Sequence, residues 1–160
     1  MTRRAPAEVA DTDPLTGVAN RRAWEAEAAR NLARTRRTGE PLCFAIIDLD
    51  GFREVNDRDG HSAGDALLRD LTVGWTGRLR EADLLGRYGG DEFVLCLPAT
   101  EEDGAWELIG QLNGTHEFPW SAGSPPPGAG TASPPCSRAP TPTSTGASAT
   151  AGRPEAAAVR

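Results

Sequence analysis

The chain lacks any long hydrophobic run. No stretch of its 160 residues approaches the roughly 20 consecutive apolar residues that a membrane-spanning helix requires. Residues 1–10 also lack the apolar core of a signal peptide. We therefore expect a cytoplasmic protein without a membrane partner.

An excess of basic residues is also missing. The formal net charge is −6 and the isoelectric point is about 4.9. General nucleic-acid binding requires a basic surface, so this charge balance argues against it. A small anionic ligand remains compatible with the composition if metal ions bridge it to the protein.

Cysteine is scarce. Cys43, Cys96 and Cys136 are odd in number, and their separations do not resemble those of metal-binding motifs. We expect reduced thiols in a cytoplasmic protein.

Strand and helix patterns alternate along most of the chain, which fits one domain of the α/β or α+β class. Apolar positions at helical spacing predict helices over 23–37, capped by Asn20, and over 105–112. A third helix is expected from His61 to near Arg80, with Ser62 and Asp65 as a capping box. Phe52 begins a short helix, which we expect to end in a polar turn at 56–60.

The strand patterns place acids at strand ends. The continuous apolar run 42–47 predicts a buried central strand, and it leads directly into Asp48 and Asp50. Gly89 and Gly90 stand between two apolar runs and predict a tight β-hairpin, with Asp91 directly after it. Residues 118–121 are expected to begin a further strand. Acids at a strand end and a hairpin tip suit a divalent cation, although an ordinary hairpin with solvated acids is equally compatible with the heptapeptide 87–93 alone.

The composition changes abruptly after residue 123. Of the 37 residues from Ser124 to Arg160, 31 are Pro, Gly, Ala, Ser or Thr. Such a segment has too little apolar area to offset the entropy of ordering it, so we expect it to be disordered.

Four segments together resemble the GGDEF family of diguanylate cyclases. They are DPLTGVANRR at 13–22, DLDGFREVNDRDGHSAGD at 48–65, RLREAD at 78–83 and RYGGDEF at 87–93. The resemblance implies a flexible lead-in at 1–12, a GGDEF domain at 13–123 and a disordered tail at 124–160. It implies a palm-like fold, with a mostly antiparallel sheet flanked by helices. It further implies that a homodimer condenses two GTP molecules into cyclic di-GMP and two pyrophosphates.

The resemblance also assigns the metal and catalytic residues. Asp48, the carbonyl of Leu49 and Asp91 would bind Mg²⁺ or Mn²⁺. Asp91 would also help to deprotonate the attacking 3′-hydroxyl, and Glu92 would support the second ion.

Nucleotide contacts follow in the same way. Asn56 and Asp65 would read guanine, since an amide and a carboxylate match its donor and acceptor edge. Asp65 has an alternative role in the capping box, and His61, expected beside the nucleotide, has one as a structural loop residue. Arg53 would lie near the phosphates, and Gly89 and Gly90 would let the backbone lie against the nucleotide.

Arg80 and Asp83 match the family's product-inhibition motif, R-x-x-D. An arginine can bind phosphate or stack on guanine, while the carboxylate accepts from the base edge. The alternative is an arginine at a helix end that pairs with a loop acid.

The chain departs from the family after Gly123. The family continues with a helix of the type A-D-x-A-L-Y-x-A-K-x-x-G-R-N, whose cations hold the GTP phosphates, and nothing like it occurs in 124–160. A frameshift would explain the change, and we expect an incomplete domain with impaired turnover. The alternative function is a non-catalytic module that binds cyclic di-GMP or GTP.

Overall fold

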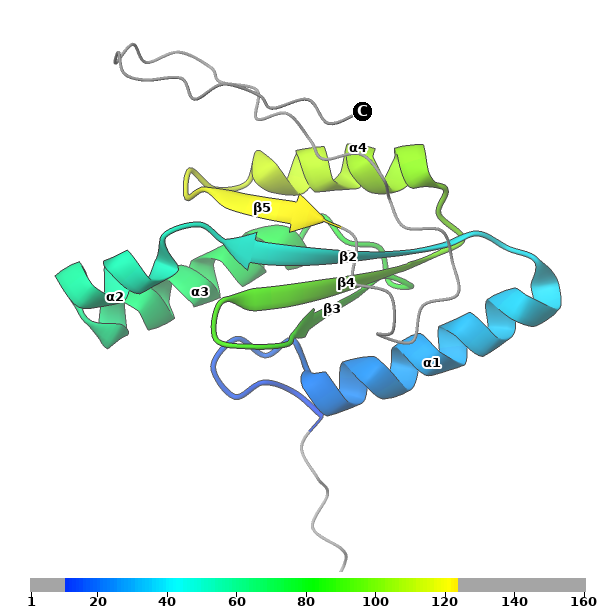
Figure 1. The fold of residues 1–160 in the computed structure, drawn as a ribbon, viewed down its shortest axis with the longest axis horizontal. Coiled ribbons are helices and arrows are strands. Elements are labelled where there is room, and N and C mark those ends of the chain that lie inside the picture. Colours follow the sequence, from blue (N-terminus) through cyan, green and yellow to red (C-terminus); the bar gives the residue numbers. More distant parts are fainter. Residues whose placement is uncertain (1–10, 124–160) are drawn as a thin grey trace, which may run out of the picture.

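The computed structural model describes residues 11–123, which form a sheet flanked by helices (Figure 1). The helices are α1 (Arg21–Thr38), α2 (Phe52–Asp59), α3 (His61–Thr76) and α4 (Glu102–Asn113). The strands are β1 (Ala19–Asn20), β2 (Leu42–Leu49), β3 (Leu84–Arg87), β4 (Glu92–Pro98) and β5 (Trp120–Gly123). The expected tail at 124–160 and most of the expected lead-in lie outside the described residues.

The five strands form one sheet in the order β1-β3-β4-β2-β5. The short β1 pairs with β3 in parallel, and every other pairing is antiparallel. The expected α+β architecture with a mostly antiparallel sheet is therefore confirmed. The apolar run at 42–47 lies within β2, which is hydrogen-bonded to β4 on one side and to β5 on the other.

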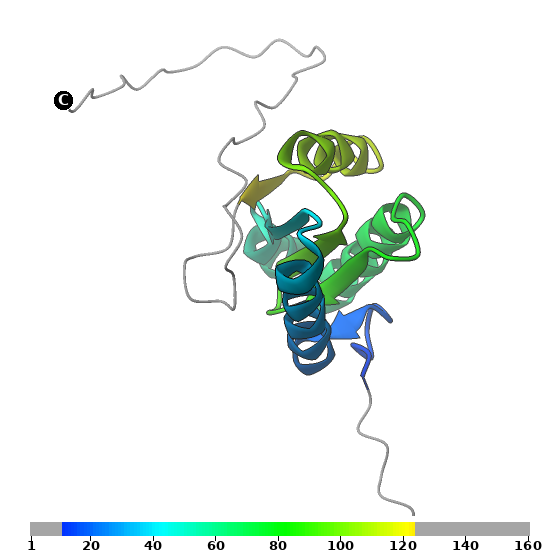
Figure 2. The ribbon, with the colours of Figure 1, turned by 90° about the vertical axis from the view of Figure 1, so that its right-hand side faces the viewer.

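Alternate side chains of the central strands face opposite layers of helices. Cys43, Ala45 and Ile47 of β2 belong to the larger core with α3 and α4, whereas Leu42 and Phe44 pack with α1. Figure 2 shows α1 on one side of the sheet, with α3 and α4 on the other. This period of two is that of a strand buried on both faces.

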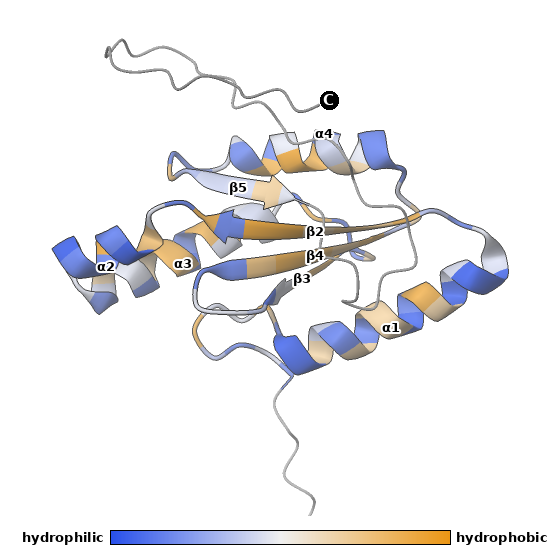
Figure 3. Ribbon diagram, in the orientation of Figure 1, coloured by the Kyte–Doolittle hydropathy of each residue, from blue (hydrophilic) through white to orange (hydrophobic). Residues whose placement is uncertain are grey.

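The central strands are hydrophobic along most of their length (Figure 3). Their colour changes to hydrophilic where β2 ends and β4 begins, on adjacent strands. Among residues 11–123, no helix has the length and apolar character needed to cross a lipid bilayer. The polar strand ends are therefore the part of the sheet where functional side chains are expected.

Helix α1 begins as the sequence predicts. The side-chain oxygen of Asn20 accepts a hydrogen bond from the Ala23 N–H at 2.9 Å, and Trp24, Ala28 and Leu32 are buried. The residue after the helix, Gly39, adopts a left-handed conformation with φ of 72°. These are the usual start and stop signals of a helix.

The predicted capping box at α3 is wrong. The residue before the helix is Gly60, with φ of 87°, and no side chain caps the helix. Helix α3 begins at His61, which places Ser62 inside the first turn. The expected turn at 56–60 is also wrong, because α2 continues through Asn56 to Asp59. Helix α3 ends at Thr76, before Arg80.

The hairpin is confirmed, but its loop is longer than a tight two-residue turn. Strand β3 ends at Arg87 and β4 begins at Glu92, so four residues connect them. The N–H groups of Tyr88 and Gly89 both donate to the Glu92 carbonyl, at 2.8 and 3.2 Å. Neither Gly89 nor Gly90 has a positive φ, which the favoured two-residue turns require.

Candidate functional site

Acidic side chains gather where β2 ends and β4 begins. Asp48 pairs in register with Glu92, and the Leu49 N–H donates to the Asp91 carbonyl at 3.2 Å. The side chain of Leu49 is buried in the core, whereas Asp48 and Glu92 are exposed. The antiparallel pairing thus brings together residues that the sequence separates by more than 40 positions.

Burial and neighbouring negative charges both disfavour the ionised form of Asp48 in this acidic group. Partial burial, followed by the negative charges of Asp91 and Asp50, raises the pKa of the Asp48 carboxyl above its ordinary value of 3.8. A bound cation would relieve this repulsion. Within residues 11–123 no three His, Cys, Asp or Glu side chains form a metal-binding group by themselves. A site here would therefore use the main-chain carbonyl of Leu49 as well as carboxylates.

Asp50 differs from Asp48 in its partners. The Ser121 hydroxyl donates to both Asp50 carboxylate oxygens, at 2.9 and 3.1 Å, and the Asp50 N–H donates to the Pro119 carbonyl at 3.1 Å. These bonds join the end of β2 to the segment that enters β5. Asp50 thus contributes to structure, in addition to its effect on the charge of Asp48.

Arg87 holds the loop that carries Gly89 and Gly90. Its Nε donates to the Gly89 carbonyl at 3.2 Å, and its Nη2 donates to the Gly90 carbonyl at 2.8 Å. Its Nη1 reaches Asp13 at 3.2 Å, and both side chains of this ion pair are mostly buried. The sequence places Arg87 in the fourth motif, but nothing in the pattern identified it as the support of the loop.

Asp13 is held on the other side by its own turn. Its Oδ2 accepts from the N–H and the hydroxyl of Thr16, at 2.9 and 2.7 Å. Burial alone would raise the pKa of Asp13, but the Thr16 hydrogen bonds and the charge of Arg87 outweigh it and lower that pKa below 3.8. Asp13 is therefore a charged structural residue that links the first motif to the fourth.

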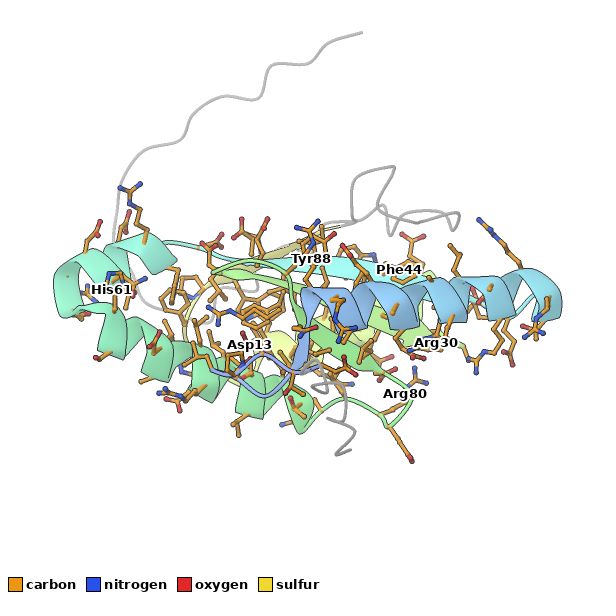
Figure 4. The ribbon with its side chains drawn as sticks, turned by 90° about the horizontal axis from the view of Figure 1, so that it is seen from below. Asp13, Arg30, Phe44, His61, Arg80 and Tyr88 are labelled. Carbon is orange, nitrogen blue, oxygen red and sulfur yellow. The ribbon has the colours of Figure 1, made fainter. Side chains whose placement is uncertain are left out.

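Helix α1 contacts the same loop through Tyr88. The Tyr88 hydroxyl donates to Glu25 Oε1 at 2.7 Å, and Arg21 Nε donates to the same oxygen at 3.0 Å. The Arg21 guanidinium carbon lies 4.3 Å from the centre of the Tyr88 ring, within the range of a cation–π contact. Figure 4 shows Tyr88 beside the first turns of α1.

The expected guanine-reading residues occupy adjoining helices. Asn56 lies on α2 and Asp65 on α3, and both are half-buried. Gly64, within α3, permits the close approach of the two helices. A Cβ atom at Gly64 would lie 2.0 Å from the Asn56 Oδ1 atom and 3.1 Å from Phe52. Sequence reasoning missed this role, although a small residue beside Asp65 was a possible signal.

His61 and Arg53, two members of the expected nucleotide site, are exposed. His61 is the first residue of α3, at the end of the molecule remote from Arg80 (Figure 4). The Arg53 side chain is 92% exposed, with its Nε 3.8 Å from Asp57 Oδ2. Neither side chain is fixed by a buried contact, so each is free to adjust to a ligand.

Arg80 and Asp83 bind each other. The Arg80 Nη2 and Nε donate to the two Asp83 carboxylate oxygens at 2.9 and 3.2 Å, and the Arg80 N–H donates to Asp83 Oδ2 at 2.9 Å. The Asp83 side chain is fully buried, while that of Arg80 is 57% exposed. A base contact by Asp83 would therefore require the Arg80 guanidinium to move.

Residues 10–126 match the family described as diguanylate cyclase, GGDEF domain. The chain is 43% identical over 101 residues to diguanylate cyclase DgcP of Pseudomonas aeruginosa, covering 63% of this chain and 15% of DgcP. It is 42% identical over 91 residues to diguanylate cyclase DosC of Escherichia coli K12, covering 57% of this chain and 20% of DosC. The chain thus spans only a small part of these relatives.

Solved structures agree with the sequence comparisons. Diguanylate cyclase SiaD of Pseudomonas aeruginosa, crystallised with its activator SiaC, superposes with a TM-score of 0.69 at 33% identity, covering 72% of this chain and 49% of SiaD. The GGDEF domain of DgcB from Caulobacter crescentus, in complex with c-di-GMP, gives 0.68 at 27% identity, covering 77% of this chain and 76% of that domain. With the four motifs and the sheet that joins them, these matches show that the chain belongs to the GGDEF family of diguanylate cyclases.

Proposed function

We propose that residues 13–123 are a GTP-binding diguanylate cyclase domain. The observation that carries the proposal is the meeting of Asp48 and Asp91 at the paired ends of β2 and β4, in a chain of this family. The raised pKa of Asp48 supports it, because part of the shift, after that caused by burial, comes from the negative charges of Asp91 and Asp50, and these charges favour a bound cation.

Asp48, the carbonyl of Leu49 and Asp91 are the proposed ligands of Mg²⁺ or Mn²⁺. Such ions prefer oxygen ligands and, when bound, neutralise the α-phosphate and lower the pKa of an attacking hydroxyl. The exposed position of Glu92, opposite Asp48, suits a role beside a second ion. Asp91 is the proposed acceptor of the proton of the 3′-hydroxyl.

Asn56 and Asp65 are the proposed readers of the guanine base. The Asp65 carboxylate accepts from the N1–H and the exocyclic amine, while the Asn56 amide offers both a donor and an acceptor. The absence of a side-chain cap at α3 supports this role, because Asp65 is not engaged in the expected capping box. His61 and Arg53, both exposed, are proposed to approach the ligand from the same helices, with Gly89 and Gly90 on the opposite side.

Catalysis in this family brings two such domains together, so we propose a homodimer in which each copy holds one GTP.

We propose that turnover by this chain is weak, because residues 124–160 contain no counterpart of the family's phosphate-binding Lys and Arg motif. Each lost charge-assisted contact costs about 1.5–3 kcal/mol. A second candidate is a non-catalytic module, favoured by the same change, that binds GTP or cyclic di-GMP.

Titration calorimetry on the 160-residue protein tests the proposal, together with a turnover assay in Mg²⁺ and GTP. We expect GTP binding that requires a divalent cation, is weakened by Asp65→Asn, and is accompanied by little cyclic di-GMP synthesis. Robust synthesis would show that the domain is not impaired. Absence of binding to both GTP and cyclic di-GMP would contradict both candidates.

The frameshift hypothesis has its own test in the DNA that follows the codon for Gly123. Translation of that DNA in the other two frames should show a segment of the A-L-Y-x-A-K type. If neither frame does, the frameshift is refuted and the change after Gly123 needs another explanation.

A further inference from the structure

Thr100 binds the guanidinium of Arg80 in addition to Asp83. The Arg80 Nη2 donates to the Thr100 hydroxyl at 2.6 Å and to the Pro98 carbonyl at 3.3 Å. Thr100 is only 8% exposed, and its hydroxyl in turn donates to the Pro98 carbonyl at 2.9 Å. Arg80 is thus bonded to both the 78–83 loop and the turn between β4 and α4.

Thr100 itself is fixed by the core. The Cys43 thiol, buried at the start of β2, donates to the Thr100 carbonyl at 3.2 Å. The preceding residue, Ala99, has φ of 49°, and it is the only non-glycine residue with a positive φ among residues 11–123. A turn that adopts this conformation is held by its surroundings, so the hydroxyl of Thr100 has a defined position.

These bonds leave one edge of the guanidinium available. The Nε and Nη2 groups bind Asp83, Thr100 and Pro98, while Nη1 makes no hydrogen bond to any residue in the described part of the chain. Two hollows, of about 580 and 390 Å³, both include Arg80 and Asp83 in their walls. These volumes fall in the range of small-molecule sites.

We propose that Thr100 is a positioning residue for the cyclic di-GMP site, holding Arg80 so that its Nη1 edge is presented to the ligand. This inference rests on the product-inhibition role that the R-x-x-D motif implies for Arg80, and on the proposed binding of cyclic di-GMP. Fixing a long side chain before binding removes the entropy cost of ordering it when the ligand arrives. Thr100 would therefore affect the affinity for cyclic di-GMP without touching the ligand.

The decisive variant is Thr100→Val, which removes the hydroxyl and keeps the shape. We expect its dissociation constant for cyclic di-GMP to rise about tenfold, as for a lost hydrogen bond to a charged group. Thr100→Ser keeps the hydroxyl and should restore the affinity to within about twofold. The affinity for GTP with Mn²⁺ should stay unchanged in both variants, because the acidic site lies at the opposite ends of β2 and β4 from Thr100.

Thr115→Val is the matched control. Its hydroxyl donates to the Leu112 carbonyl at 2.7 Å, at the opposite end of α4, so it loses a comparable bond away from Arg80. Calorimetry should give an unchanged affinity for cyclic di-GMP. Equal weakening by Thr115→Val, full affinity in Thr100→Val or failure of the serine variant would each overturn the proposal. Absence of cyclic di-GMP binding by the unaltered chain would overturn it too, while GTP binding would still test the catalytic site separately.

A second measurement does not depend on any threonine variant. In ¹⁵N relaxation of the unaltered protein, the Arg80 Nε–H group should be as ordered as the backbone, with an order parameter near 0.85. The exposed Arg78 provides the internal comparison, and Arg80→Lys assigns the signal. If Arg80 is as mobile as Arg78, the guanidinium is not held and the proposal is overturned.

Discussion

Asp13 and Arg87, 74 positions apart in the chain, form an ion pair with a distance of 3.2 Å between Oδ2 and Nη1. The two side chains are only 16% and 17% exposed. Because the same guanidinium donates to the carbonyls of Gly89 and Gly90, the ion pair connects the N-terminal turn to the loop beside the acidic site.

Replacing Arg87 should therefore affect both stability and binding. We expect Arg87→Gln to lower the free energy of unfolding by about 2–4 kcal/mol, since it leaves the Asp13 charge mostly buried and without its partner. The affinity for GTP with Mn²⁺ should fall as well, because the loop loses its support. Urea unfolding and calorimetry measure the two effects. Arg30→Gln, which removes an exposed ion pair with Glu27, is the control and should change stability by less than about 1 kcal/mol.

The contribution of Asp13 should depend on pH. Its pKa in the folded protein is lowered below 3.8, so its ionised form stabilises the fold above that value. This stabilisation is lost as the pH falls from 3.8 through the lower folded-state pKa. The difference in unfolding free energy between the unaltered protein and Asp13→Asn should therefore shrink between pH 7 and pH 3. Parallel pH curves for the two proteins would contradict the assignment.

The ionised form of Asp48 should have the opposite effect on stability to that of Asp13. Its pKa is raised in the folded protein, so its ionised form destabilises the metal-free fold at neutral pH. Asp48→Asn should be more stable than the unaltered chain at pH 7 in EDTA, and this gain should vanish below pH 3.8, where the carboxyl is protonated in both states.

Addition of metal should make the unaltered chain more stable than Asp48→Asn. Mn²⁺ at 100 times its dissociation constant should stabilise the unaltered chain by about 2.7 kcal/mol, and Asp48→Asn should lose most of this effect. Thermal unfolding with and without Mn²⁺ measures both parts. Equal stabilisation of the two proteins by Mn²⁺ would place the ion elsewhere.

Gly64→Ala tests the contact between α2 and α3. The new methyl group would overlap the Asn56 amide, at 2.0 Å from its oxygen, and we expect a loss of about 1–3 kcal/mol in stability. Displacement of Asn56 should also weaken GTP binding about tenfold. Gly110→Ala is the control, because a Cβ atom there meets nothing within 4 Å. In the middle of α4 it should instead stabilise the protein by about 0.5–1 kcal/mol.

The sequence predicted the elements whose signals are local. Asn20 caps α1 through its own side chain, and the apolar run that ends before Asp48 forms a buried strand, because each depends on residues close in the chain. The capping box at Ser62 failed because the helix begins at His61, directly after Gly60 with its φ of 87°, which places Ser62 inside the first turn. The turn expected at Asn56 failed because polar residues are equally compatible with the exposed face of a short helix.

The residues that hold the candidate site in place, Arg87 and Thr100, could not be predicted from the sequence for a different reason. Arg87 binds Asp13, and Thr100 binds Arg80, across separations of 74 and 20 positions. Such pairs have no periodic pattern, since each depends on how the sheet brings distant segments together. Asp48 and Asp91 were identifiable because acids at strand ends stand out, whereas an arginine or a threonine in a loop does not.

The pairing of β2 has a consequence for how the domain opens. Seven register pairs join β2 to β4, from Leu42–Pro98 to Asp48–Glu92, but four join it to β5. Local opening at β5 thus leaves the longer ladder intact, and amide hydrogens of β5 should exchange with solvent sooner than those of β4. Asp48 lies on the longer ladder and Asp91 directly precedes it, so the pairing of β2 with β4 holds the two carboxylates together independently of the chain after Gly123.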